Sequence, residues 1–248
     1  MFYIFSSSTS AQYTRCCLLT KRDLIEAYAT EAVIYDHTRA IFERGRFAAR
    51  ERLLYSQYLR KKGNLLVVAC GTGRHFNHIC NELSVDVVGI DVCVEMLKIA
   101  RTKERRVSLM RGDAENLPFQ DNVFDAVVCS RAFYLFEDKF AFLISARRVL
   151  KTRGHVLVST FSKGTFITRL CLKLKLLEQD PTEYPYDSKD LCSMLNKVSF
   201  KVVHTRAIAL ITDIPIMAYL PKFMLDFVGS VEDVLTDGRW VMAIGKKM

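Results

Sequence analysis

The sequence predicts an α/β fold, built on a doubly wound and mostly parallel sheet of seven strands. Short apolar runs alternate with segments of helical spacing along most of the chain, which is typical of strands connected by helices. Several runs are continuously apolar, as expected for strands that are buried on both faces. The 248 residues are enough for one such domain with its own core.

These patterns give the elements in chain order. We expect strands at 65–69, 86–90, 107–110, 124–129, 155–161, 200–209 and 239–245. We expect one or two helices within 24–59, and further helices at 74–83, 94–101, 139–150, 165–177 and 189–198. The chain contains no internal repeat, so the sheet is predicted to form one unit with N-terminal helices.

The charge is basic, with a formal net value of +9. Such a balance fits RNA, an anionic membrane surface or an acidic substrate as partner. Because no basic run is long, a solvated basic surface is the preferred interpretation. The eight cysteines form no Cys-x-x-Cys pair and no regular framework. This favours buried thiols in a reducing cytoplasm. His75, His78 and Cys80 also lack a convincing metal-ligand spacing, and no metal is expected.

The N-terminal residues 1–20 are expected to form a loosely ordered tail, because they lack the features of a signal peptide. No window reaches the length of a membrane span. The nearest, 207–228, is interrupted by two prolines and three charged residues. A cytoplasmic location is therefore predicted, with contact at a membrane surface left open.

A glycine turn follows the first predicted strand. Residues 67–74 read Val-Val-Ala-Cys-Gly-Thr-Gly-Arg, and glycines at a strand-to-helix turn let a ligand approach the backbone closely. The next strand ends at Asp91, 18 residues after Gly73. That is about the spacing at which a carboxylate meets ribose hydroxyls in Rossmann-like folds. A tight turn without ligand, and a helix cap at Asp91, are the structural alternatives.

Five ordered segments carry a family resemblance. They are LLVVACGTGR at 65–74, VVGIDVCVEMLKIAR at 87–101, RGDAENLPF at 111–119, FDAVVCSRAFYLF at 124–136 and RVLKTRGHVLVSTF at 148–161. The chain resembles class I methyltransferases dependent on S-adenosylmethionine (SAM), in particular the small-molecule branch that includes the ubiquinone and menaquinone biosynthesis enzymes. The resemblance implies strand order 3-2-1-4-5-7-6, with a SAM-binding core at about 62–161 of a domain that spans 21–248.

The resemblance also assigns roles to residues. It places Asp91 on the ribose hydroxyls, Asp113 on the adenine amino group, and the 69–73 loop along the methionine and ribose. The implied SAM-binding residues are Ala69, Cys70, Gly71, Thr72, Gly73, Asp91, Val92, Met96, Asp113, Ala114, Glu115, Cys129 and Ser130. One position departs from the family, which usually carries an acid where this chain has Val67.

The acceptor is less well defined by the sequence. Tyr35, Arg131 and Tyr134 are candidates to contact it, although Tyr35 can equally be a helix-packing aromatic. Residues 211–235 are rich in apolar side chains, which predicts a small lid suited to a hydrophobic acceptor. The 165–177 segment mixes basic and apolar residues, as a membrane-surface helix or a helix packed on the sheet would.

The predicted function is therefore transfer of the SAM methyl group to a small molecule, which the apolar lid suggests is hydrophobic, with S-adenosylhomocysteine as the product. Two alternatives remain at this point. The chain can be a SAM-binding regulatory or scaffold protein without turnover, which Val67 suggests, or a tRNA or protein methyltransferase. Nucleic acid is disfavoured because the segment after 124–129 lacks the proline motif of amino-methylating enzymes. No catalytic base can be assigned, and oxygen, nitrogen and carbon acceptors are not distinguished.

Overall fold

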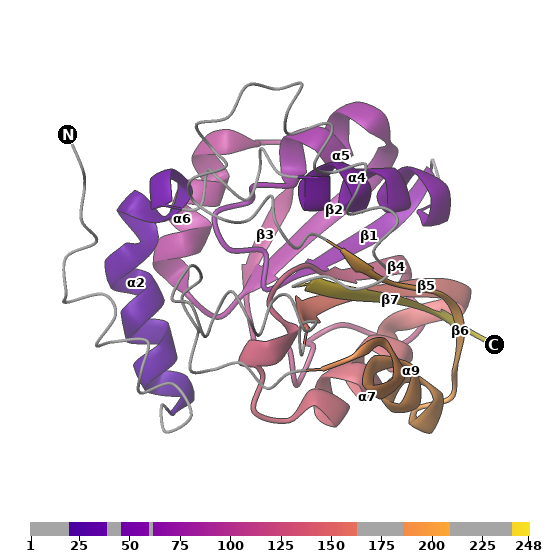
Figure 1. Ribbon diagram of the computed structural model, residues 1–248. Helices are drawn as coiled ribbons and strands as arrows, with labels where there is room; N and C mark the ends of the chain where they lie inside the picture. The colour runs from indigo at the N-terminus through magenta and orange to yellow at the C-terminus, as the bar shows by residue number, and fades with distance from the viewer. Residues whose placement is uncertain (1–19, 39–45, 60–61, 163–185, 209–239) are drawn as a thin grey trace, which may run out of the picture.

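The structure is a computed structural model that describes residues 20–38, 46–59, 62–162, 186–208 and 240–248. A seven-stranded sheet runs through its centre (Figure 1). The strands are β1 (Lys62–Val68), β2 (Ser84–Asp91), β3 (Ser108–Arg111), β4 (Phe124–Cys129), β5 (Leu150–Phe161), β6 (Phe200–Ile208) and β7 (Trp240–Lys247). Their order is β3-β2-β1-β4-β5-β7-β6, and only β7 runs antiparallel to its neighbours. The predicted fold class and strand order are confirmed.

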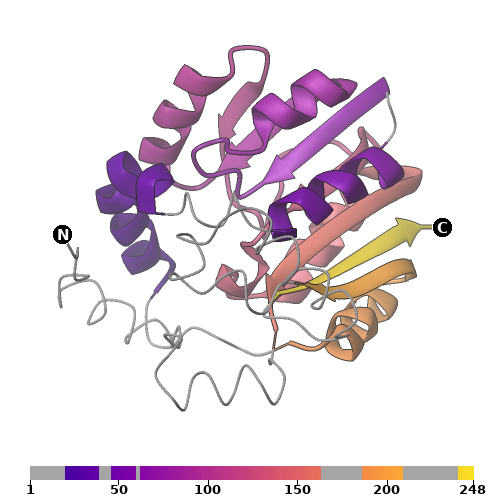
Figure 2. The ribbon, with the colours of Figure 1, turned by 45° about the horizontal axis from the view of Figure 1, so that its top comes forward.

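Helices cover both faces of this sheet (Figures 1 and 2). One face carries α4 (Arg46–Tyr58), α5 (Phe76–Glu82) and α6 (Val94–Lys103), whose apolar side chains share one core cluster. The other face carries α7 (Lys139–Val149) and α9 (Ser188–Lys197), which share a second cluster. The N-terminal α2 (Lys21–Thr38) packs against α6, so the segment predicted as one or two helices forms two.

Strand β1 shows why the continuous apolar run forms a buried strand. Leu65 and Val67 enter the cluster under α4 and α5, whereas Leu66 and Val68 enter the cluster under α7. Side chains alternate between the two faces of a strand, so both faces need apolar residues when helices cover both. Full burial of each such side chain contributes roughly 1.5–3 kcal/mol.

The helices of the second face begin at acidic caps. Asp138 accepts a hydrogen bond from the backbone N–H of Ala141 at 2.9 Å, before α7. Asp187 and Asp190 form a reciprocal capping box at the start of α9. Such caps satisfy backbone donors that the first helical turn leaves unpaired, and each stabilises its helix by about 1 kcal/mol.

Strand β5 differs from its predicted bounds. It begins at Leu150 rather than at residue 155, because Leu150 already pairs with Phe124 before the register shifts to the pair of Ala126 with His155. Arg153, with φ of 66°, lies in this irregular stretch. The stretch before Gly154, which the prediction left outside the strand, is thus a bulge within a longer strand. The predicted tail, the 165–177 helix and the 211–235 lid lie outside the described residues.

Candidate functional site

The loop after β1 stands at the carboxyl edge of the sheet, where open α/β sheets bind their ligands. Ala69, Gly71 and Gly73 all have positive φ, of 50°, 53° and 70°. A Cβ atom on Gly71 would meet no atom within 4 Å, whereas one on Gly73 would lie 2.5 Å from the ring of Phe76. Gly71 therefore leaves the loop open on its ligand side, and Gly73 lets the loop pack on α5.

Asp91 ends β2 directly beside this loop. Its Oδ2 accepts a hydrogen bond from the N–H of Gly71 at 2.7 Å, and its Oδ1 accepts one from the N–H of Cys93 at 2.9 Å. Burial raises the pKa of the Asp91 carboxyl, while the N–H groups of Cys93 and Gly71 act in the opposite direction. Each carboxylate oxygen can accept a further bond, so Asp91 fixes the loop and still has acceptor capacity for ribose hydroxyls. It is not the N-cap of α6, which is Cys93.

Asp113 and Glu115 follow β3, and both bind Lys21 at the start of α2. The Lys21 Nζ lies 2.6 Å from Asp113 Oδ2 and 3.3 Å from Glu115 Oε2. Burial alone would lower the pKa of Lys21, but the hydrogen bond and the charge of Asp113 outweigh it and raise that pKa. Asp113 Oδ1 also accepts from the N–H of Glu115 at 3.0 Å, and Ala114 between them is buried. The carboxylate expected to meet adenine is thus held by the N-terminal helix.

The other end of α2 reaches the glycine loop. Asp36 accepts a hydrogen bond from the Thr72 hydroxyl at 2.7 Å and forms an ion pair with Lys103 of α6. Between these ends, Tyr35 packs in a cluster with Met96 and Ala32. Met96 is buried in that cluster, and Val92 is partly buried. Helix α2 therefore spans the edge of the sheet from β3 to the loop, and the proposed contacts of Tyr35 and Met96 with a ligand stay predictions.

Of the site residues predicted at the end of β4, one lies in the core and two lie at the carboxyl edge of the sheet. Cys129 is fully buried, and burial raises the pKa of its thiol far above the usual range. A side chain so placed contacts the core, and only its backbone can border a ligand. Ser130 and Arg131 lie beyond it at the edge, and Cys70 in the β1 loop is likewise buried. Arg131 has a positive φ of 57°, a conformation that costs free energy for a non-glycine residue and is often found at functional sites.

A buried polar cluster at this edge was not predicted. Glu51 of α4, only 2% exposed, accepts hydrogen bonds at Oε1 from the hydroxyl of Ser130 and, at 3.3 Å, from that of Ser159 in β5. Its Oε2 lies 3.5 Å from Arg131 Nη2 in an ion pair. The Ser159 Oγ also accepts from the backbone N–H of Arg131 at 2.8 Å, so Glu51 and Ser159 together fix the segment after β4.

His75, at the start of α5, completes this cluster. Its Nε2 lies 3.1 Å from Arg131 Nη2 and 3.2 Å from Ser130 Oγ. Because a guanidinium nitrogen only donates, Nε2 accepts from Arg131, and the ring proton is assigned to Nδ1. The ring of Tyr55 meets the His75 ring edge to face, with centroids 6.0 Å apart. Burial and the charge of Glu51 raise the pKa of Tyr55 well above its usual range, so its phenol stays protonated.

One sequence signal for Glu51 exists in the pattern of α4. Glu51 shares the helical spacing i, i+3, i+4 with Leu54 and Tyr55, both of which are buried. A carboxylate on the apolar stripe of an amphipathic helix is unusual, because a buried charge needs a partner. Its partners lie 79 and 108 residues away along the chain, and no local pattern predicts them.

Val67, the departure from the family pattern, points into the apolar cluster shared by α4 and α5 and is 2% exposed. It can offer no polar contact to a ligand. Within the described part of the chain, the buried carboxylate at this end of the loop is that of Glu51. It extends from helix α4, and its Oε2 lies 3.9 Å from Nε2 of His75, which follows the loop.

Tyr134 belongs to a group of packed aromatic rings beside the Glu51 cluster. It lies in the short 3-10 helix η2 (Phe133–Leu135), and its ring centroid is 4.8 Å from that of Phe161. Phe161 in turn stacks on Trp240 at 4.1 Å. Phe161 ends β5 and Trp240 begins the antiparallel β7; both rings are buried in the core cluster, and Tyr134 packs against it at the carboxyl edge.

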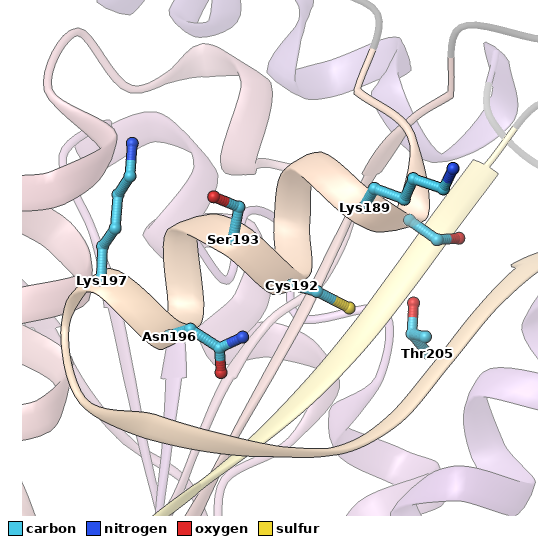
Figure 3. Close-up of a pocket in the computed structure, with 7 residues that line it drawn as sticks. Lys189, Cys192, Ser193, Asn196, Lys197 and Thr205 are labelled. Atoms are coloured by element: carbon cyan, nitrogen blue, oxygen red, sulfur yellow. The ribbon is translucent and has the colours of Figure 1, made fainter.

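A separate cavity of about 660 Å³ lies between α9 and the edge strand β6. Figure 3 shows Lys189 and Lys197 on α9, and Cys192 pointing toward Thr205 of β6. None of its lining residues is among those predicted to bind SAM. The cavity is therefore distinct from the edge formed by the β1 loop, Asp91 and Asp113.

Three other predictions concern metals, thiols and membranes. Across the described ranges, no group of three or more His, Cys, Asp or Glu side chains is placed to hold a metal ion. The five described cysteines are all free thiols. No helix in the described part of the chain has the length and apolar character needed to cross a membrane.

The strand order, the glycine turn and the carboxylates after β2 and β3 define a Rossmann-like domain of the class I methyltransferase type. A family model described as a methyltransferase domain matches residues 66–158. Demethylmenaquinone methyltransferase from Corynebacterium kroppenstedtii is 31% identical over 198 residues, which cover 69% of this chain and 83% of that protein. The chain belongs to the class I SAM-dependent methyltransferases, and its methyl donor is SAM.

Two further likenesses extend this finding. Demethylmenaquinone methyltransferase from Renibacterium salmoninarum is 32% identical over 133 residues, which cover 53% of this chain and only 56% of that protein. A solved methyltransferase in complex with the Haloferax volcanii activator Trm112 has a TM-score of 0.67 and 19% identity, and covers 88% of this chain and 96% of that one. At that identity, the structural match shows the fold alone.

Proposed function

We propose that this protein transfers the methyl group of SAM to a small apolar or amphipathic acceptor of the quinone-precursor kind. The observation that carries the proposal is the 31% identity with a demethylmenaquinone methyltransferase over 83% of that relative's length. The partly buried ring of Tyr134, which packs on the buried rings of Phe161 and Trp240 at the edge where Arg131 lies, suits such an acceptor.

The chain's residues support binding of SAM across this edge. The backbone of Gly71 is open to a ligand, and Asp91 stands beside it with acceptor capacity for two hydroxyls. Asp113 and Glu115 offer oxygens at the β3 end, where Lys21 now binds them. When bound, SAM supplies a methyl group already activated by its sulfonium. The main task of the protein is then to orient donor and acceptor and to exclude water.

An apolar acceptor agrees with the position of the aromatic rings of Tyr134, Phe161 and Trp240 at the carboxyl edge of the sheet. Phe161 and Trp240 are both less than 10% exposed, and Tyr134 is partly buried. Hiding apolar acceptor surface against Tyr134 would contribute roughly 25 cal/mol for each Å². The lid predicted at 211–235 lies outside the described residues. A cytoplasmic location, possible contact with a membrane surface and nucleic acid as a disfavoured partner remain predictions from the sequence.

The test is transfer of label from methyl-labelled SAM. The protein is incubated with reduced demethylmenaquinone, and in parallel with bulk tRNA at low and high salt. Label in the organic extract supports the proposal, and the Asp91→Ala variant should abolish most of it. Label in tRNA that disappears at high salt would show phosphate-driven RNA binding instead. An unbiased metabolite extract serves as a second acceptor pool, and its labelled product identifies the true acceptor if the quinol fails.

Retention of SAM without any labelled product in either pool would favour the alternative of a binding protein without turnover. Val67 was the reason to consider it. The buried Glu51 weakens that reason, because an acidic group is present at the same end of the loop.

A further inference from the structure

The strongest unexplained feature of the molecule is the ion pair between Glu51 and Arg131. Glu51 is 2% exposed, and its Oε2 has no hydrogen-bond partner among the described residues, although its Oε1 has two. Buried carboxylate oxygens are almost always satisfied, because leaving one unpaired costs free energy. The nearest cation, Arg131 Nη2, lies 3.5 Å from Oε2 without hydrogen-bond geometry.

Several hydrogen bonds hold the surroundings of this pair. Ser130 and Ser159 hold Oε1 of Glu51, while Ser159 also holds the backbone of Arg131 in its left-handed conformation. His75 accepts from the guanidinium on its other side. The side chain of Arg131 is 12% exposed and lies nearer the surface than that of Glu51. The guanidinium of Arg131 thus lies between the more deeply buried carboxylate of Glu51 and the surface, at the end of β4.

We infer that this pair recognises the amino-acid end of SAM, with Arg131 binding the α-carboxylate and Glu51 Oε2 binding the α-ammonium. A carboxylate and a guanidinium placed side by side are complementary to an α-amino-acid zwitterion, which carries the same two charges in reverse. As the ligand carboxylate draws the guanidinium outward, Oε2 is uncovered for the ammonium. Both contacts are charge-assisted hydrogen bonds, which are stronger than neutral ones.

The position of the pair supports this assignment. Asp91 and Asp113 follow β2 and β3, on one side of the β1 loop, and offer the acceptors that suit a nucleoside. Strand β4 adjoins β1 on the other side, and Arg131 follows it. An elongated ligand whose nucleoside meets Asp91 therefore directs its amino-acid end toward Glu51 and Arg131. The inference rests on the proposed function, because it takes SAM as the ligand.

The inference also explains Val67. The side chain at this position is apolar and buried, so the ammonium needs another anion. Glu51 reaches the same end of the loop from α4 and is held in place before any ligand binds. A preorganised partner of this kind lowers the cost of ordering on binding.

The test compares three ligands by calorimetry. SAM carries both charged groups, decarboxylated SAM lacks the carboxylate, and 5′-methylthioadenosine lacks the whole amino-acid end. Glu51→Gln should weaken SAM and decarboxylated SAM roughly 10- to 100-fold, the effect of one charged hydrogen bond. Arg131→Gln should weaken SAM to a similar extent and leave decarboxylated SAM nearly unchanged. Both variants should bind 5′-methylthioadenosine within about twofold of the wild type, as expected for an independent contact.

Glu82→Gln, an exposed position at the end of α5, is the matched control and should bind all three ligands normally. The inference is overturned if Glu51→Gln binds SAM as the wild type does. It is equally overturned if that variant loses 5′-methylthioadenosine in parallel, because the cluster would then only support the fold. Normal SAM affinity with lost methyl transfer would assign the pair to the acceptor instead. A wild-type protein that binds neither SAM nor S-adenosylhomocysteine refutes the proposed function itself.

Discussion

The two halves of the candidate site are built in different ways. On the β2 and β3 side, the polar groups come from loops that directly follow strands, and Asp91 bonds to a neighbour two residues away and to the adjacent loop. On the β4 side, the central carboxylate comes from helix α4 and meets partners from β4, β5 and α5. The carboxylates of the first half end or follow their strands, although Lys21 reaches Asp113 from 92 positions away. The second half depends on the assembly of the whole domain.

This difference predicts how each half tolerates change. A local carboxylate can be removed with consequences mainly for the ligand and the loop beside it. A carboxylate shared by four elements stabilises the fold as well as any ligand, and its removal leaves buried partners unpaired. The substitutions below separate the two kinds of effect.

Val67→Asp should have the largest effect. It restores the acid that the family usually carries, but at a position that is 2% exposed in an apolar cluster. An unpaired buried charge costs roughly 3–5 kcal/mol, so urea unfolding should show a loss of stability of about that size. Val67→Asn introduces a side chain with the shape of aspartate but no charge, and should lose less stability. If Val67→Asp is as stable as the wild type and binds SAM more tightly, the β4 side does not rely on Glu51.

Asp91→Ala should have the next largest effect, this time on binding. The variant loses charge-assisted hydrogen bonds to the ribose, which weakens S-adenosylhomocysteine by roughly 1.5–3 kcal/mol. It also frees the N–H groups of Gly71 and Cys93, so some loss of thermal stability should accompany it.

Glu95→Ala is the control for Asp91→Ala. Glu95 lies in the first turn of α6 and forms an ion pair with Lys98 at 3.9 Å. Calorimetry should show nearly unchanged affinity for this variant. Equal losses in the two variants would remove Asp91 from the ligand site.

Lys21→Gln should have the smallest effect. The side chains of Lys21 and Asp113 are 33% and 39% exposed, and ion pairs with such exposure contribute about 1 kcal/mol or less. For a domain of this size, thermal unfolding should shift by no more than about 2–4 °C. Because Lys21 occupies the Asp113 carboxylate, its loss should leave affinity for S-adenosylhomocysteine equal or tighter. A weaker affinity would instead show that Lys21 contacts the ligand directly.

The difference between local features and tertiary contacts also determines how much the sequence could predict. The strands, the β1 turn and the placement of Asp91 follow from short segments whose apolar runs and glycines act locally, whereas the strand order came from the family resemblance. The start of β5 was missed because the pairing of Leu150 with Phe124 is a tertiary feature, and a bulge looks like a turn in sequence. The contact of Lys21 with Asp113 was missed because it joins residues 92 positions apart.

Glu51 was missed for a related reason. Its neighbours Arg50 and Arg52 are charged, so Glu51 reads as one more polar residue despite its spacing from Leu54 and Tyr55. Only the packing of α4 on the sheet brings its carboxylate to Ser130 and Ser159. Cys129 shows the opposite case, because the sequence placed it correctly at the strand end but did not show that its side chain faces the core.

The central claim is that this edge binds SAM and its product, and calorimetry with S-adenosylhomocysteine tests it most directly. The glycine turn, Asp91 and the Glu51–Arg131 pair predict heat of binding at sub-millimolar ligand, together with an increase in the thermal unfolding temperature, since a ligand that binds only the folded state stabilises it. Absence of both heat and thermal shift, with S-adenosylhomocysteine and with SAM, would contradict the account.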